Sequence, residues 1–126
     1  MGLNDKQTEK NRHFTQAFRH AIAGVWTVVA DERNLRYHLV AAVVAVVAGW
    51  YYAISELEWL MVVLAIFFVV ASEFANTIAE SLADLIVGDR YDPLVKKVKD
   101  VAAGSVLLAA TFAVVVAIII FVPKIF

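Results

Sequence analysis

Apolar residues occur in three long runs that short polar segments separate. The runs cover about residues 39–54, 59–71 and 101–122. An α-helix rises 1.5 Å per residue, so about 20 residues are needed to cross the hydrocarbon core of a bilayer. Flanking aromatic and polar residues bring each run to this length. The pattern therefore predicts three transmembrane helices, over about residues 37–54, 59–86 and 98–122.

The segment before the first run has a helical period of its own. Apolar side chains recur there every three or four positions, with Arg19 and His20 between them: Phe14, Phe18, Ile22, Val25 and Val29. An apolar face opposite a polar one predicts an amphipathic surface helix over about residues 13–30, lying in the membrane interface. The polar residues 1–12 are expected to fray. Residues 31–38 predict a charged break, and residues 55–58 a short turn.

Composition supports one integral-membrane domain over residues 1–126, of the all-α membrane class. The chain has 126 residues, of which 62% are hydrophobic, and its mean hydropathy is +0.75. These values are too apolar for an ordinary soluble fold. The absence of cysteine excludes disulfides and thiolate metal sites. Nucleic acid is not expected as a partner, because no basic patch stands apart from the membrane flanks.

The basic residues predict the orientation in the membrane. Of the 11 Lys and Arg residues, six precede the first span, four lie between the second and third spans, and one follows the third. Loops rich in Lys and Arg stay in the cytoplasm. The N-terminus and the segment 87–100 are therefore expected on the cytoplasmic side of a plasma membrane, and residues 55–58 outside.

A stripe of polar side chains marks the second span near its cytoplasmic end. Glu73, Asn76, Glu80 and Asp84 follow one another at steps of three, four and four residues, which places them on one face of a helix. Helix rise places Glu73 about 21 Å from the start of the span, near the headgroup boundary. Ionisable groups at membrane depth are costly, so the stripe predicts a functional site.

The residue types on and around this stripe favour phosphoryl transfer. Carboxylates without His or Cys suit Mg²⁺, which takes one or two of them and fills its shell with water and phosphate oxygens. Glu32 precedes the first span and Lys99 opens the third, where a lysine suits a polyphosphate. A further carboxylate could accept the proton of an alcohol. The chain has neither a Walker loop nor a kinase glycine loop, so a nucleotide site here must have another design.

Plainer interpretations of single residues stay open. Asp84 and Asp100 could be solvated charges, and Glu73 could serve an interhelical hydrogen bond. Anchoring at the membrane surface explains Lys96 and Lys97. The three histidines have no ligand spacing and are expected at the interface: His13, His20 and His38.

Two other classes of function compete with an enzyme. A small proton- or ion-coupled transporter could use Glu73 as its coupling acid, but its acids would lie nearer the bilayer midplane. A purely structural membrane subunit would leave the polar stripe unexplained.

Two sequence blocks carry a resemblance to a known family. EFANTIAESLAD fits E-x2-N-[ST]-x2-E-x3-D, and VKDVAAGSVLL fits K-D-x-A-[AG]-[GA]-x-V. Together, across the loop between two spans, they resemble the small integral-membrane lipid kinases of the prokaryotic diacylglycerol kinase family. Glu32-Arg33-Asn34 with Arg36 and His38 resembles the E-R-N-x-R-x-H form of the undecaprenol kinase branch. The resemblance covers about residues 14–124, although Arg90-Tyr91-Asp92 stands where the family usually has E-Y-H.

The resemblance implies a bacterial membrane enzyme and roles for its residues. It implies a homotrimer of three-span protomers, whose active sites are shared between protomers at the cytoplasmic boundary. The implied reaction is ATP-dependent phosphorylation of undecaprenol to undecaprenyl phosphate, with diacylglycerol, giving phosphatidic acid, as the alternative. By position, Glu73 is the catalytic base and Asn76 orders the site, while Glu32 and Glu80 hold Mg²⁺ on ATP. The residues implied to contact the nucleotide are Tyr91, Asp92, Lys99 and Asp100, together with Arg90.

Overall fold

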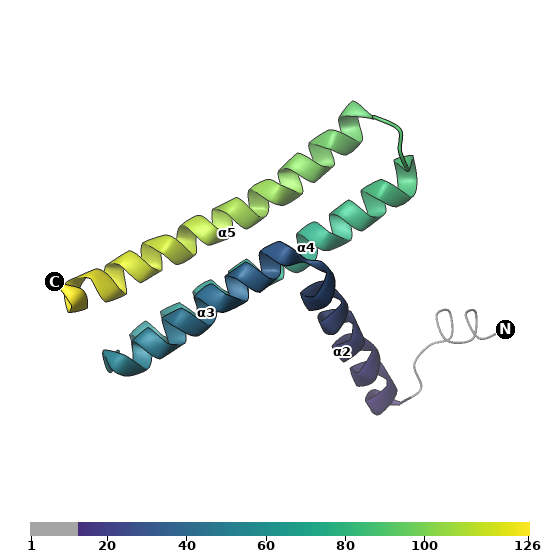
Figure 1. Ribbon diagram of the computed structural model, residues 1–126. Helices are drawn as coiled ribbons and strands as arrows, with labels where there is room; N and C mark the ends of the chain where they lie inside the picture. The colour runs from purple at the N-terminus through teal and green to yellow at the C-terminus, as the bar shows by residue number, and fades with distance from the viewer. Residues whose placement is uncertain (1–12) are drawn as a thin grey trace. The chain divides into compact units, whose positions relative to one another are not determined.

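The structure is a computed structural model that describes residues 13–126. Over these residues the chain forms four helices and no strand: α2 (Phe14–Asp31), α3 (Arg33–Tyr51), α4 (Glu56–Val87) and α5 (Pro93–Ile125) (Figure 1). The predicted all-α class is confirmed for this part of the chain. The expected fraying of residues 1–12 lies outside the described residues.

The chain divides into two compact units, with α2 in the first and α3, α4 and α5 in the second. The helix α2 ends at Asp31, and its large apolar side chains are exposed, Phe14, Ile22 and Trp26 among them. The rings of Phe14 and Phe18 stack with their centroids 6.1 Å apart. An exposed apolar stripe is what an interfacial helix needs, and the interfacial location stays a prediction.

The predicted charged break over residues 31–38 is wrong in its extent. Only Glu32 leaves the helical conformation, with φ −97° and ψ 106°, and α3 begins at Arg33. Arg36 donates its backbone N–H to the carbonyl of Glu32 over 3.3 Å. The side chain of Leu35 in this first turn is wholly buried. Packing of an apolar face supplies most of the stability of a helix in a protein, so a polar segment that buries Leu35 can be helical.

The predicted turn over residues 55–58 is also wrong, because a helix begins inside it. Ser55 is the N-cap of α4, and its hydroxyl accepts a bond from the N–H of Glu58, whose carboxylate accepts the N–H of Ser55 over 2.8 Å. This reciprocal capping box satisfies two backbone donors that a helix start leaves free. Its signature is Ser followed three positions later by Glu, so local sequence rules would have identified it.

The loop between α4 and α5 follows the rules of helix termination. Gly88 follows α4 with φ +59°, a left-handed conformation that glycine adopts without a side-chain clash. Asp92 caps α5, and its Oδ1 accepts the N–H of Leu94 at 2.8 Å and that of Val95 at 3.3 Å. Pro93 is the first residue of α5. The prediction of Asp92 as N-cap and Pro93 as first helical residue is confirmed.

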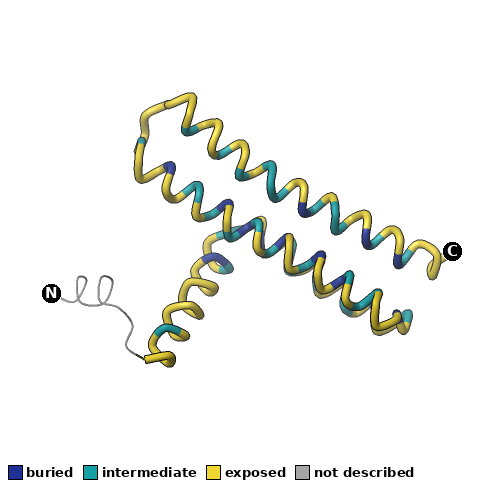
Figure 2. Tube along the Cα trace, turned by 180° about the vertical axis from the view of Figure 1, so that it is seen from behind, coloured by how far each residue is buried: buried dark blue, intermediate teal, exposed yellow. Residues whose placement is uncertain are grey.

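The second unit is an antiparallel arrangement of three helices. The helix α4 packs along α5 and also against α3. The buried and half-buried positions of α4 and α5 follow their facing sides (Figure 2). A cluster of buried residues forms the core, away from the α4–α5 loop: Ile54, Val62, Ala65, Val116 and Ile120. Because α3 is shorter, the loop end of α4 and α5 extends past its first turn (Figure 1).

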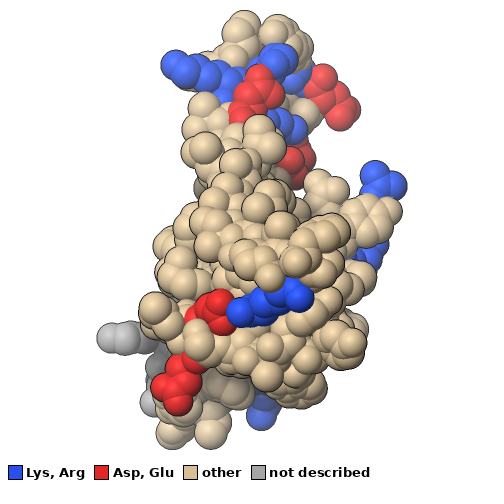
Figure 3. Space-filling view, turned by 90° about the vertical axis from the view of Figure 1, so that its left-hand side faces the viewer, with Lys and Arg blue, Asp and Glu red and all other residues tan. Residues whose placement is uncertain are grey.

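Two of the described helices, α4 and α5, are long and apolar enough to cross a membrane. They contain 32 and 33 residues, which corresponds to about 48–50 Å by helix rise and exceeds the ~30 Å hydrocarbon core. In α3, Arg33 and Arg36 in the first turn lower the mean hydropathy. In the view of Figure 3, charged side chains gather around the α4–α5 loop at the top, and fewer lie on the lower part of the molecule, where Lys124 of α5 pairs with Glu58 of α4. This distribution fits helices whose ends lie in water.

Candidate functional site

The two buried polar side chains of the described residues belong to the predicted stripe. Glu73 is 1% exposed and Asn76 is 7% exposed, both on α4. A step of three residues along a helix places them on the same face. Burying a carboxylate costs free energy unless it is paired or hydrogen-bonded, so a residue at such a position needs a functional or structural reason.

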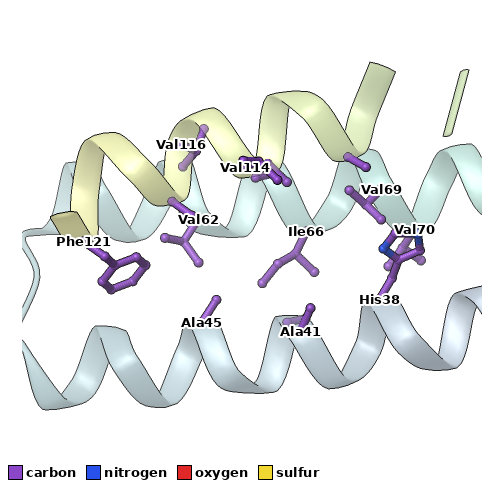
Figure 4. A pocket seen from close by; sticks show the side chains of 15 residues that line it. His38, Ala41, Ala45, Val62, Ile66, Val69, Val70, Val114, Val116 and Phe121 are labelled. Atoms are coloured by element: carbon purple, nitrogen blue, oxygen red, sulfur yellow. The ribbon is translucent and has the colours of Figure 1, made fainter. Parts of the chain in front are cut away.

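The ionisable side chain that contacts Glu73 comes from α3. Nε2 of His38 lies 3.2 Å from Oε1 of Glu73, and the imidazole is itself half-buried. The sequence predicted His38 only as an interface residue, which stays a prediction, and did not identify this contact with Glu73. The ring lies beside Val69 and Val70 of α4 (Figure 4). The place of His38 in the E-R-N-x-R-x-H segment was the one sequence signal that this residue belongs to the site. Spacing within one helix could not identify its partner on another helix.

Two oxygen atoms of the site lack a hydrogen-bond donor. Oε1 of Glu73 and Oδ1 of Asn76 are buried and have no hydrogen-bond partner within residues 13–126. Oε1 is within ion-pair distance of His38, yet the two groups do not have the geometry of a hydrogen bond. An unsatisfied buried acceptor costs about 1–3 kcal/mol. A hydroxyl donor that entered the site would remove this cost.

The carboxylates of Glu32 and Glu80 act on Glu73 through space. Both repel its charge, while His38, when protonated, attracts it. Each of the two side chains is half-exposed. Glu32 lies at the junction before α3 and Glu80 lies two turns beyond Glu73 on α4. Three carboxylates that are separate in the sequence are thus brought into one electrostatic environment.

The donor set fits a Mg²⁺ ion that arrives with a nucleotide. In the described part of the chain, no group of three or more His, Cys, Asp or Glu side chains could hold a metal ion alone. Mg²⁺ seldom uses a full protein cage and takes one or two carboxylates with phosphate oxygens. Glu32 and Glu80 carry half-exposed carboxylates, the type of oxygen donor that such an ion takes.

Lys99 connects the start of α5 to the stripe on α4. Its Nζ lies 2.6 Å from Oδ1 of Asp84, and the charge of Glu80 also acts on it. The neighbouring pair, Lys96 with Asp100, lies within α5 at a spacing of four residues. Exposed pairs of this kind contribute about 0–1 kcal/mol, so Lys99 could exchange Asp84 for a phosphate at little cost.

The family resemblance implies that further residues contact a nucleotide. These residues lie in the α4–α5 loop and at the start of α5, near Lys99. The side chain of Tyr91 is exposed in the loop, and that of Asp100 is exposed and paired with Lys96. The carboxylate of Asp92 already caps α5. A contact between Asp92 and a nucleotide would compete with this cap, so the structure gives Asp92 a structural role of its own.

Comparisons with known proteins agree with this chemistry. Residues 19–121 match the family described as prokaryotic diacylglycerol kinase. An undecaprenol kinase of Bacillus subtilis (strain 168) is 36% identical over 98% of this chain and 99% of its own length. A diacylglycerol kinase of Synechocystis sp. is 40% identical over 79% of this chain and 57% of its own length. A diacylglycerol kinase of Helicobacter pylori (strain J99) is 28% identical over 85% of each. The resemblance carried by the two sequence blocks, including the undecaprenol kinase branch, is confirmed.

Proposed function

Since the chain belongs to the prokaryotic diacylglycerol kinase family and is a lipid kinase, we propose that it phosphorylates undecaprenol with ATP. The observation that carries the proposal is the buried carboxylate of Glu73, with an unsatisfied oxygen, at the boundary between the apolar helices and the charged loop end. A lipid hydroxyl cannot rise far from the interface, and a nucleotide cannot sink far into it. The two substrates meet where Glu73 lies.

Glu73 is the general base of the proposed reaction. Its carboxylate accepts the proton of the lipid hydroxyl while the hydroxyl oxygen bonds to the γ-phosphorus of ATP. The bond between the γ-phosphorus and the bridging oxygen breaks, and ADP leaves. Asn76, one turn away, orders the site with its buried amide. His38 is placed to stabilise the carboxylate when the imidazole is protonated.

The nucleotide lies on the loop side of Glu73. Glu32 and Glu80 would hold Mg²⁺, which would neutralise charge on the phosphate oxygens. Lys99 offers an ammonium group to the phosphates. Tyr91, Asp92 and Asp100 are further nucleotide contacts, at the start of α5 and in the loop before it. All of these residues lie outside the apolar part of the helices, where a highly charged ligand can remain hydrated.

The same proposal includes the topology and the assembly. One domain, residues 1–126, has a surface helix over about 13–30 and three spans over about 37–54, 59–86 and 98–122. The middle of α3 is apolar, with Trp50 and Tyr51 at its end, which supports a third span beside α4 and α5. The N-terminus and the active site face the cytoplasm of a bacterial cell. The assembly is a homotrimer with shared sites, and the resemblance to the family supports it.

Relatives support undecaprenol as the lipid. The Bacillus subtilis relative is named an undecaprenol kinase and matches almost the entire chain. The E-R-N-x-R-x-H segment also belongs to that branch; its His38 lies 3.2 Å from Glu73, and the charge of its Glu32 acts on Glu73, which supports this choice. Diacylglycerol is the alternative substrate, as in the names of the other relatives.

A competition assay tests this proposal. Purified protein in detergent micelles is given γ-labelled ATP and Mg²⁺ with equal amounts of undecaprenol and diacylglycerol, and a sample without Mg²⁺ is the control. We expect label mainly in undecaprenyl phosphate, and none without Mg²⁺. Equal labelling of both lipids would remove the assignment of undecaprenol, and labelling of neither lipid would overturn the proposed function.

A further inference from the structure

A groove between α3, α4 and α5 begins at the polar site and continues into the apolar part of the second unit. Its volume is about 280 Å³. His38 lies at one end, while Phe121 of α5 lies at the other (Figure 4). On α5 the groove extends from Ala110 to Phe121, which is about 16 Å by helix rise.

The lining of the groove is almost entirely hydrocarbon. Its one polar residue is His38, and the rest are alanine, valine, isoleucine and phenylalanine. Small side chains on the opposed helices leave the space between them open, for example Ala41, Ala45, Ala110, Ala113 and Ala117. An apolar groove of this kind excludes water and accepts a hydrocarbon ligand.

At its polar end the groove is lined by His38, which lies next to the proposed base. The imidazole of His38 lines the groove and also lies 3.2 Å from Oε1 of Glu73. That oxygen is buried and has no hydrogen-bond partner among the described residues. An alcohol whose O–H approached Glu73 from this side would leave the first carbons of its chain in the groove.

The volume limits how much of a chain fits. A cavity of about 150 Å³ lined by aliphatic side chains holds one benzene molecule. The volume of the groove, about 280 Å³, is roughly twice that of this cavity, so the groove has room for about a dozen carbon atoms. A polyprenol is built from five-carbon units, so about two units fit and the remainder of the chain lies in the bilayer.

We propose that this groove binds the two isoprene units next to the hydroxyl of the polyprenol substrate and directs that hydroxyl to Glu73. The inference rests on the proposed function and adds a chain-binding site to it. In this proposal, the groove residues of α3 and α5 bind the lipid. They are separate from the residues that bind the nucleotide. The occupant is a lipid chain because the lining is hydrocarbon and because His38, at the polar end, lies next to the carboxylate that accepts the hydroxyl proton in the proposed reaction.

Photolabelling tests the site without any need for turnover. Geranylgeraniol with a diazirine in its second isoprene unit is added to the purified full-length protein in micelles, irradiated, and the labelled residues are identified by mass spectrometry. We expect label on Ala41, Ala45 or Ala113, and competition by unlabelled undecaprenol. Label confined to exposed residues outside the groove, such as Val43 and Val115, would overturn the proposal.

Filling the groove gives an independent test. Ala113→Leu adds bulk inside the groove, and Ala103→Leu is the matched control, an exposed alanine of α5 outside it. One methylene more or less in an apolar pocket alters specificity by about 10–200-fold, and leucine adds three carbons to the alanine side chain. We expect Ala113→Leu to raise the KM for undecaprenol at least about tenfold and to leave the KM for ATP unchanged, while Ala103→Leu changes neither.

The outcomes separate this inference from the proposed function. If the unmodified protein phosphorylates undecaprenol and Ala113→Leu behaves like Ala103→Leu, the groove proposal is overturned and the function stands. If the protein phosphorylates neither lipid, the function is overturned, and an absence of label in the groove then overturns the site as well. Disulfide cross-linking of Ala113→Cys between two copies would show that a second copy covers the groove, which also overturns the proposal.

Discussion

Replacement of Glu73 by glutamine removes the proposed base with little change in shape. The carboxylate is 1% exposed, so an amide of similar size occupies the same space. Glutamine cannot accept the proton of an alcohol, and a positioned general base contributes about 10²–10⁴-fold to a rate. At 1.36 kcal/mol for each factor of ten, the barrier should rise by about 2.7–5.4 kcal/mol. We therefore expect turnover to fall at least about a hundredfold.

Binding of the nucleotide should be nearly normal in this variant. Glu32, Glu80 and Lys99 are unchanged, and the two carboxylates lose a charge that repels them. The variant loses the ion pair with His38, but it also loses the cost of a buried carboxylate, so folding should be retained. The expected signature is a large fall in kcat with a similar dissociation constant for Mg²⁺–ATP.

A matched variant controls for the substitution itself. Glu56→Gln changes an exposed glutamate in the first turn of the same helix, about 25 Å from Glu73 by helix rise. Both variants are purified in detergent, and turnover is measured with labelled ATP at saturating lipid alongside equilibrium ATP binding. Glu56→Gln should keep its activity. A Glu73→Gln protein that kept more than a tenth of the original turnover number would refute the assignment of the base.

Three further predictions concern the metal, the topology and the packing. Glu80→Gln should weaken Mg²⁺–nucleotide binding and shift the Mg²⁺ dependence of activity to higher concentration, and an unchanged dependence would contradict the ligand assignment. Cysteine at Ser55 should react with an impermeant reagent in intact cells and cysteine at Asp89 should not; labelling of Asp89→Cys would reverse the orientation. Gly49→Ala should lower the unfolding free energy in detergent by about 1–3 kcal/mol, because its Cβ would lie 2.6 Å from Cη2 of Trp59. A variant as stable as the original would mean that the Trp59 ring moves freely.

Local rules were enough for most of the helices and their ends. The helical period placed Glu73 and Asn76 on one face, and the pair Asp92-Pro93 identified the start of α5. The two errors, over residues 31–38 and 55–58, came from treating charge as a helix breaker. Charged side chains at a helix start can be tolerated or even satisfy backbone donors, as Glu58 does in the capping box.

The amino-acid sequence by itself determined the helical class, the polar stripe on α4 and the family, because these depend on periodicity and on short motifs within continuous segments. The tertiary structure alone decided that Glu73 is buried, that His38 of α3 lies against its carboxylate, and that a groove leads from His38 into the apolar region. These features depend on the register between helices. Register is set by the packing of many side chains at once, and no spacing within a single helix records it.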